Sequence, residues 1–165
     1  MTDRLAGKVA VITGSARGLG AAYAKAFAAE GAMVCVSDVL DTAATVCGIE
    51  KDAGKAIGIK CDIGDIKACE AMAAATIEAF GGIDILVNNA ALFVDLKRGS
   101  FLDIESEDWD RVMAVNVRGS FNAAKSVVPA MRQRGGGSII NITSTTALKG
   151  IPFALDYVTS KGAII

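Results

Sequence analysis

Tyr157 and Lys161 are the residues whose types and spacing are best suited to chemistry. They are four residues apart in a stretch predicted to be helical, so both side chains would project from one face, about one turn apart. An ammonium group beside a tyrosine stabilises the phenolate form, which lets the tyrosine act as a general base or, in the reverse direction, as a general acid. The pair therefore predicts a proton-transfer site.

The composition excludes several other chemistries. The sequence has no histidine, so Ser-His-Asp and Cys-His schemes cannot operate. The spacing of the four cysteines matches neither a CxxC pair nor a zinc knuckle, and no metal site is expected. We interpret them as small buried thiols of a reducing cytosol. They are Cys35, Cys47, Cys61 and Cys69.

Length and charge indicate the broad class of protein. The chain has 165 residues, 52% of them hydrophobic, which predicts one globular domain over 1–165. The net charge of -1 leaves no basic excess for phosphates, so nucleic acid is not an expected partner. No apolar run approaches the roughly 18 residues that cross a membrane, and the N-terminus is charged. We expect a cytoplasmic protein without a membrane partner.

Strand and helix patterns alternate along the chain. Continuous apolar runs separated by helices predict a parallel sheet covered on both faces, a doubly wound α/β fold of about five strands. Pro129 is expected to kink the helix that contains it, and Pro152 to lie in the first turn of the last helix. The expected strands are 9–13, 33–37, 56–61, 83–87 and 138–142. The first expected helix runs from the glycine-rich turn to residue 30, and the others span 41–53, 65–80, 106–134 and the stretch from 152 onward.

A glycine-rich turn connects the first expected strand to the first helix. Gly14, Gly18 and Gly20 would let backbone N–H groups approach a pyrophosphate at the helix N-terminus. Asp38 ends the second strand, where a carboxylate can accept hydrogen bonds from both ribose hydroxyls and repel a 2′-phosphate. This favours NAD over NADP. Arg17 opposes that preference, because it could pair with a 2′-phosphate or could equally be a solvated surface charge.

Taken together, these motifs resemble the short-chain dehydrogenase/reductase family over the whole chain. The resemblance implies a Rossmann-like fold, and it implies that the loop residues contact the cofactor and that Asp62 and Ile63 hold the adenine. It also implies that Asn88 and Ala90 line the cofactor's path while steadying the sheet. Ala91 departs from the usual glycine. The motif residues are Thr13, Gly14, Ser15, Ala16, Arg17, Gly18, Leu19 and Gly20; Asp62; Asn88, Asn89 and Ala90; Asn116; Ser144; and Tyr157, Val158, Thr159, Ser160 and Lys161.

The resemblance also implies catalytic roles. Tyr157 would exchange the proton of a secondary alcohol or ketone, and Lys161 would also hydrogen-bond the nicotinamide ribose. Ser144, just past the fifth strand, would polarise the substrate oxygen. Asn116, in mid-helix, would hold a water in a proton relay to the lysine. An oxidoreductase acting on a small alcohol or carbonyl compound is the expected function.

Family members usually run longer, so the chain is expected to be C-terminally truncated, without the last strands. An inactive nucleotide-binding module is the alternative to an active dehydrogenase. The helix over 106–134 and the one from Pro152 resemble elements through which family members pair, which predicts a homo-oligomer. Apolar side chains hint at an apolar substrate, although core packing explains them equally well. They are Phe93, Leu96, Leu148 and Phe153.

Overall fold

The protein forms a five-stranded parallel sheet, seen in a computed structural model that describes residues 3–93, 96 and 99–165. The strand order is β3-β2-β1-β4-β5, so the chain crosses the sheet between β3 and β4. This arrangement confirms the predicted Rossmann-like doubly wound fold. The strands are β1 (Val9–Thr13), β2 (Met33–Asp38), β3 (Lys55–Lys60), β4 (Ile85–Asn88) and β5 (Ser138–Asn141).

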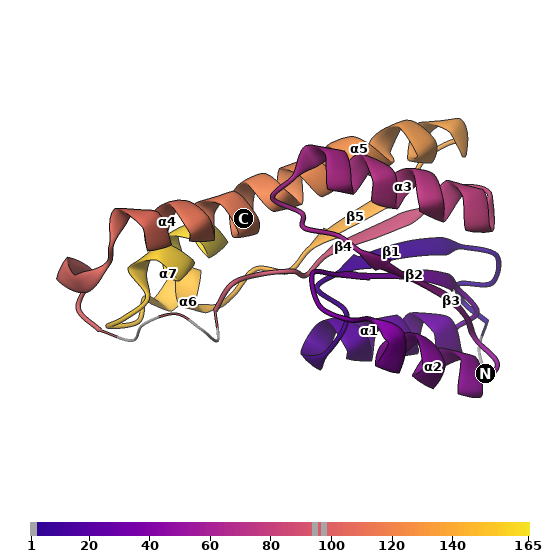
Figure 1. The fold of residues 1–165 in the computed structure, drawn as a ribbon, viewed down its shortest axis with the longest axis horizontal. Coiled ribbons are helices and arrows are strands. Elements are labelled where there is room, and N and C mark those ends of the chain that lie inside the picture. Colours follow the sequence, from indigo (N-terminus) through magenta and orange to yellow (C-terminus); the bar gives the residue numbers. More distant parts are fainter. Residues whose placement is uncertain (1–2, 94–95, 97–98) are drawn as a thin grey trace.

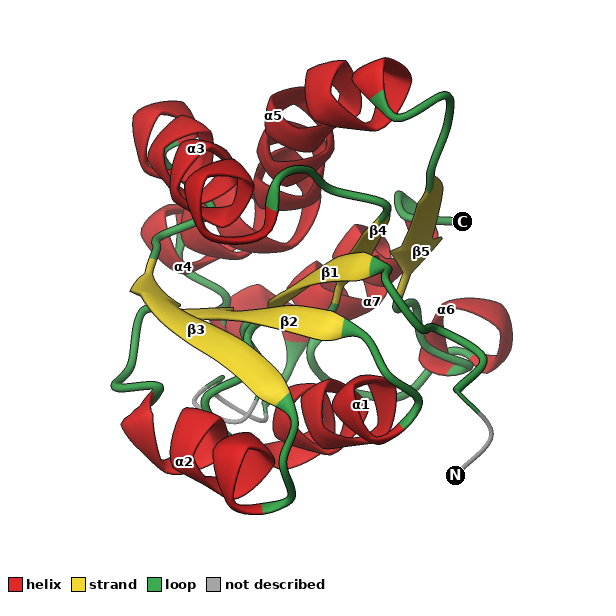
Figure 2. Ribbon diagram, turned by 90° about the vertical axis from the view of Figure 1, so that its right-hand side faces the viewer, coloured by secondary structure: helices red, strands yellow, loops and turns green. Residues whose placement is uncertain are grey.

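Helices cover both faces of the sheet, as Figures 1 and 2 show. One face carries α1 (Gly18–Ala29) and α2 (Ala43–Lys51), and the other carries α3 (Ile66–Phe80) and α5 (Ser120–Gln133). Beyond the sheet lie α4 (Ser106–Val112), α6 (Thr146–Lys149) and α7 (Leu155–Gly162), with a short 3-10 helix at Phe101–Asp103. None of the helices in the described part of the chain is long and apolar enough to cross a membrane.

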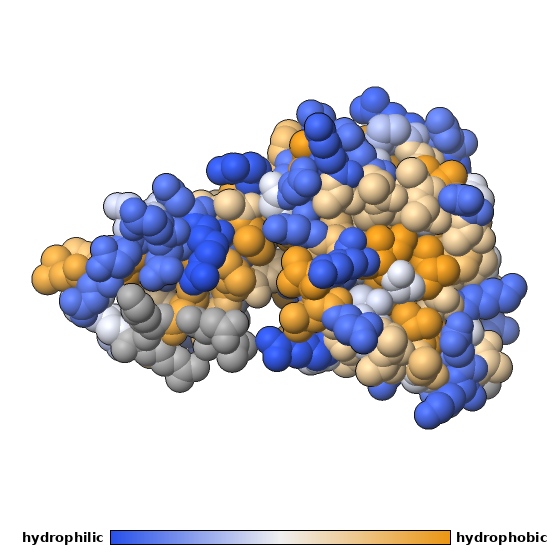
Figure 3. Space-filling model, in the orientation of Figure 1, coloured by the Kyte–Doolittle hydropathy of each residue, from blue (hydrophilic) through white to orange (hydrophobic). Residues whose placement is uncertain are grey.

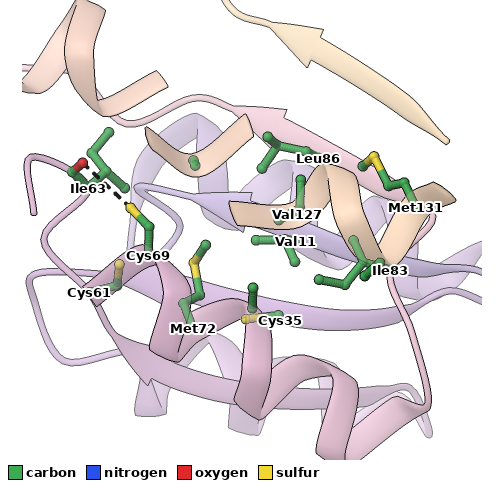
Figure 4. Close-up of a cluster of buried hydrophobic side chains, with 13 residues drawn as sticks. Val11, Cys35, Cys61, Ile63, Cys69, Met72, Ile83, Leu86, Val127 and Met131 are labelled. Carbon is green, nitrogen blue, oxygen red and sulfur yellow. Dashed lines mark hydrogen bonds between the residues drawn. The ribbon is translucent and has the colours of Figure 1, made fainter. Parts of the chain in front are cut away.

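Two apolar cores lie between the sheet and its helices. The core under α3 and α5 includes Cys35, Cys61 and Cys69 (Figure 4), as predicted for small buried thiols. Burial raises the pKa of the Cys35 thiol to about 12, which keeps it protonated and unreactive. Cys47 is exposed on α2, so the expectation of burial was wrong for this residue, whose position is on the outer side of the helix.

The expected helix over 106–134 is interrupted in its middle. A π-helical segment, Met113–Gly119, separates α4 from α5, and α5 continues through Pro129. A Cβ atom on Gly119 would lie 2.6 Å from Ile63 Cδ1, so this segment passes unusually close to the turn after β3. The departure from regular α-helix therefore lies at the segment that contains Asn116, as is frequent at functional sites, and α5 tolerates the proline.

The last helix begins later than predicted. Pro152 lies in a bend, and α7 starts only at Leu155 after Ala154, whose φ is 52°. The chain must make this left-handed turn before the helix can start, so Pro152 is not in the first helical turn. A separate short helix, α6, precedes the bend and has no counterpart among the predicted elements.

Candidate active site

The glycine loop lies at the crossover point of the sheet. β1 pairs with β2 on one side and with β4 on the other, the place where open α/β sheets bind ligands. Gly14 follows β1 with φ 64°, and a Cβ atom on it would lie 2.6 Å from the Cα of Ala90. The loops after β1 and β4 therefore touch, and only glycine fits at this contact.

Side chains from both loops fix this contact. Thr13 Oγ1 accepts hydrogen bonds from the N–H groups of Asn89 and Ala90, each at 3.1 Å. Asn89 Nδ2 donates to the carbonyl oxygens of Thr13 and Gly14, each at 2.9 Å. Asn89 thus positions the loop, a role that the sequence motif contained but that we had not assigned to it.

The N-terminus of α1 is open to an anion. Its N-cap residue, Arg17, is exposed and makes no side-chain capping hydrogen bond, whereas Asp65 caps α3 by accepting from Lys67 N–H at 2.9 Å. A Cβ atom on Gly20 would overlap the carbonyl oxygen of Gly14, so this glycine is needed for helix α1 to approach the loop. Uncapped N–H groups at the start of a helix suit a pyrophosphate, and the loop fits a dinucleotide.

Asp38 is held beside this loop at the end of β2. Its Oδ2 accepts from Ala16 N–H at 2.9 Å and its Oδ1 from Leu40 N–H at 3.0 Å. Each carboxylate oxygen can accept a further hydrogen bond. The carboxylate is therefore fixed in place and retains capacity for ribose hydroxyls.

The Ser15 side chain points into the fold rather than toward the surface of the loop. Its side chain is fully buried, with Oγ donating to Ile12 O at 2.6 Å and accepting from Ser37 N–H at 3.0 Å. The hydroxyl therefore connects β1 to β2. Only the backbone of Ser15 remains for a cofactor.

The two residues predicted to hold the adenine point in opposite directions. Asp62 is exposed after β3, and its Oδ1 accepts from Gly64 N–H at 2.8 Å. The Ile63 side chain is buried in the core, and its carbonyl oxygen accepts from Asn122 Nδ2 at 3.0 Å. An adenine could therefore meet the Asp62 carboxylate but only the backbone of Ile63.

Asn88 connects strands rather than opening toward solvent. Its Nδ2 donates to Asn141 Oδ1 at 3.0 Å and to Ser120 O at 3.2 Å, which joins β4 to β5 and α5. Its Oδ1 is buried without a hydrogen-bond partner. Asn88 therefore steadies the sheet, and Ala90, half-buried against Gly14, is the one of the two that borders the loop.

Tyr157 and Lys161 come together on α7, as their spacing predicts. The ammonium nitrogen of Lys161 lies 5.8 Å from the centre of the Tyr157 ring and donates to Ile142 O at 2.6 Å. Thr143 Oγ1 donates to Lys161 O at 2.7 Å, so two hydrogen bonds attach α7 to the segment after β5. Lys161 is 4% exposed, and this burial lowers the pKa of its ammonium.

Asn116 connects three segments around this pair. Its Oδ1 accepts from Leu92 N–H at 2.8 Å, and its Nδ2 donates to Ser160 Oγ at 2.9 Å. Ser160 Oγ in turn donates to Tyr157 O at 2.7 Å. The asparagine side chain thus fixes both the loop after β4 and helix α7. Ser160 was not among the predicted site residues, although its place between Tyr157 and Lys161 was a signal.

Ser144 lies half-buried in the segment between β5 and α6. Its Oγ accepts from Thr146 N–H at 3.2 Å and from Thr146 Oγ1 at 2.8 Å. No hydrogen bond joins Ser144 to Tyr157. The hydroxyl's own proton is not used in these two bonds, so it is available to donate.

An aromatic contact completes the site. The rings of Phe93 and Tyr157 have centroids 4.4 Å apart and are tilted by 41°. Figure 3 shows the surface narrowing between the part of the molecule that carries α4 and α7 and the part that carries the sheet, with apolar surface on both sides. Within residues 3–93, 96 and 99–165, no group of three or more acidic, cysteine or histidine side chains gathers to hold a metal ion.

The comparisons with known proteins all match the chain to the same family. The short chain dehydrogenase family model matches residues 8–165. A protein of Sinorhizobium meliloti 1021, classed among the short-chain alcohol dehydrogenases, has a crystal structure that superposes with a TM-score of 0.91 at 34% identity. That match covers 99% of this chain and 64% of the other.

Several relatives have named activities, and two of them illustrate the range. The trans-4-hydroxycyclohexanecarboxylate dehydrogenase of Sinomonas cyclohexanicum is 37% identical over 99% of this chain and 65% of its own length. The galactitol 2-dehydrogenase of Agrobacterium fabrum is 42% identical over 98% of this chain and 62% of its own length. The chain thus spans slightly less than two thirds of the length of these relatives.

Proposed function

The chain belongs to the short-chain dehydrogenase family, and from that premise we propose that it transfers a hydride between NAD(H) and a secondary alcohol or its ketone. The observation that carries the proposal is the Tyr157–Lys161 pair on α7, with the buried ammonium 5.8 Å from the phenol ring. When bound, the dinucleotide supplies the hydride acceptor or donor. The chain supplies the proton carrier and the geometry.

Tyr157 moves the proton. In oxidation its Oη takes the hydroxyl proton of the alcohol, and in reduction it returns a proton to the carbonyl oxygen. Lys161 supports the phenolate by its charge. Among the residues that the structure describes, one of its three N–H donors has a hydrogen-bond partner, Ile142 O. The remaining donors are available to a ribose hydroxyl.

Ser144 orients the substrate. Its hydroxyl proton is free to point at the substrate oxygen, because both of its hydrogen bonds with Thr146 use it as the acceptor. Asn116 acts through position: its hydrogen bonds to Leu92 and Ser160 hold the helix that carries the pair. Its amide Nδ2 also donates to Leu92 O at 3.3 Å. A contribution of Asn116 to a water relay would be a second role, in addition to this structural one.

NAD is the proposed cofactor rather than NADP. The Asp38 carboxylate is fixed by two backbone N–H groups beside the loop, where a 2′-phosphate would meet its charge. Arg17 is exposed at the N-terminus of α1, and binding of NADP through it is the alternative.

Self-association is also proposed, by resemblance of α4, α5 and α7 to the pairing elements of the family. Phe121 on α5 is 62% exposed in a single chain, an apolar side chain that a second copy would cover. Sedimentation at micromolar concentration tests this, and a stable monomer would contradict it.

The experiment for the main proposal follows NADH absorbance with a panel of cyclic and acyclic secondary alcohols and their ketones. We expect turnover with at least one alcohol and NAD, and a weaker response with NADP. Calorimetric titration of NADH accompanies it. Binding of NADH without turnover of any substrate would favour the alternative, a nucleotide-binding module without catalysis.

A further inference from the structure

We infer that Phe93 determines the substrate class, favouring secondary alcohols whose carbinol carbon lies in or beside an apolar ring over open-chain polyols. The inference rests on the proposed function. Its starting point is the ring contact, with the Phe93 and Tyr157 centroids 4.4 Å apart. A substrate that gives its proton to Tyr157 Oη must lie against this phenol, and so near the ring that packs on it.

Phe93 is held in this position by a closed set of contacts. Its chain neighbour, Leu92, is bonded at both N–H and carbonyl by the Asn116 side chain. Asn116 donates to Ser160 Oγ at 2.9 Å, and Ser160 donates to the carbonyl oxygen of Tyr157 at 2.7 Å. The ring contact between Phe93 and Tyr157 closes the set, so the backbone that carries each ring is held on both sides of the contact.

A fixed apolar wall beside the proton carrier has a chemical consequence. The flat carbon face of Phe93 offers dispersion contact and no hydrogen bond. A ring of CH₂ or CH groups next to the carbinol carbon loses no hydrogen bond there, whereas each polyol hydroxyl placed against Phe93 would lose its water without a new partner. Phe93 therefore favours the binding of a substrate with an apolar ring and disfavours the binding of an open-chain polyol.

The test compares cyclohexanol with galactitol, using NAD and the full chain. For the unaltered chain we expect the higher kcat/KM with cyclohexanol. Phe93→Ala is expected to lower kcat/KM for cyclohexanol by about tenfold or more, the scale of losing a few methylene-sized contacts in a pocket. The value for galactitol should change much less, so the preference narrows. Phe93→Leu, which keeps an apolar wall, should restore most of the preference.

A matched variant separates this role from a general effect of removing a phenyl ring. Phe101→Ala removes one that is 64% exposed on the 3-10 helix, and it should leave both substrates unaffected. Equal loss with both substrates in Phe93→Ala, or no loss with either, would overturn the inference while the proposed function stands. If the unaltered chain turns over no alcohol although NADH binds, the proposed function fails, and the inference fails with it.

Discussion

The two regions that meet at the site are built in contrasting ways. On the cofactor side, all five residues of β1 are buried between helices, and the loop after it is fixed by side chains from β2 and the β4 loop. On the catalytic side, all four residues of β5 are exposed, with Ile139 and Ile140 each 41% exposed. The cofactor side is thus supported by a buried apolar core, and the catalytic side by a small number of polar contacts.

This difference separates what each region can contribute. A buried central strand such as β1 holds the loop that follows it in place with little freedom, which suits the binding of a ligand with a fixed shape. In the catalytic region, α7 is attached through Lys161, Thr143 and Ser160, each by a hydrogen bond. Substitutions on the cofactor side should therefore change stability and affinity, whereas substitutions on the catalytic side should mainly change rate.

The largest expected effect comes from Tyr157→Phe. Removing the hydroxyl deletes the proton carrier, and the rate should fall by about 10²–10⁴-fold, the usual contribution of general acid–base catalysis. NADH affinity should change little, because the phenyl ring still packs on Phe93. Steady-state rates and calorimetric titration measure the two quantities.

The chain offers a matched control for this change. Its other tyrosine, Tyr23, lies on α1 and packs against the core under α1 and α2. Tyr23→Phe should keep the rate. If the Tyr157→Phe variant retained most of the activity, Tyr157 could not be the proton carrier, and the division between a binding region and a catalytic region would be wrong.

The cofactor side was largely predictable from the sequence, and the reason is its burial. Strands buried on both faces appear as continuous apolar runs, so β1 was predicted with its observed limits, Val9–Thr13. What the sequence could not give is where individual side chains point. The Ile63 side chain is buried in the core and lies against Gly119, which is distant in sequence, and no local pattern encodes that contact.

The catalytic side was less predictable. The Tyr157–Lys161 pairing follows from helical spacing and was predicted correctly, but the helix start was not. Pro152 is a strong local signal for a first turn, yet the start of α7 depends on the left-handed turn at Ala154. Asn116, in the π-helical segment, likewise makes hydrogen bonds with Leu92 and Ser160, which only the folded chain brings together.

The second-largest expected effect is on stability, and it is seen by comparing the same substitution in β1 and in β5. Ile12→Ala in β1 should reduce the free energy of unfolding by about 2–5 kcal/mol, because it leaves a cavity where the side chain is fully buried. Ile139→Ala in β5 should cost less than about 1 kcal/mol, since that side chain is already 41% exposed. Chemical denaturation measures both, and equal losses would show that β5 is as well packed as β1.

Asp38→Ala sharpens the comparison at the cofactor. The change removes the acceptor for the ribose hydroxyls and the charge that opposes a 2′-phosphate, so the preference for NAD(H) over NADP(H) should narrow by about tenfold or more. Calorimetric titration of both dinucleotides measures it. Asp41→Ala, a nearby exposed aspartate outside the loop, is the control. Tighter binding of NADP(H) by the unaltered chain would instead indicate that Arg17 decides the preference.

The smallest expected effect concerns Asp84, which links the two regions at the ends of the strands opposite the glycine loop. Its carboxylate accepts from Val9 N–H of β1 and from Arg134 Nε, both at 2.9 Å, and Arg134 lies just before β5. Burial alone would raise the pKa of Asp84, but these two hydrogen bonds and the positive charges of Arg134 and Lys8 outweigh it and lower the pKa.

Arg134→Gln removes the ion pair while it leaves the Val9 hydrogen bond. Because the folded-state pKa of Asp84 is lowered, the stability that its ionised form contributes is present above the unfolded pKa and is lost as the pH falls through the folded pKa. The variant should therefore be less stable at neutral pH by about 1 kcal/mol, since Arg134 is only partly buried, and the deficit should shrink in acid. Arg4→Gln, which breaks the exposed pair with Glu30, should cost less. Denaturation curves across the acid range measure this, and a deficit independent of pH would show that Arg134 acts by packing rather than through the charge of Asp84.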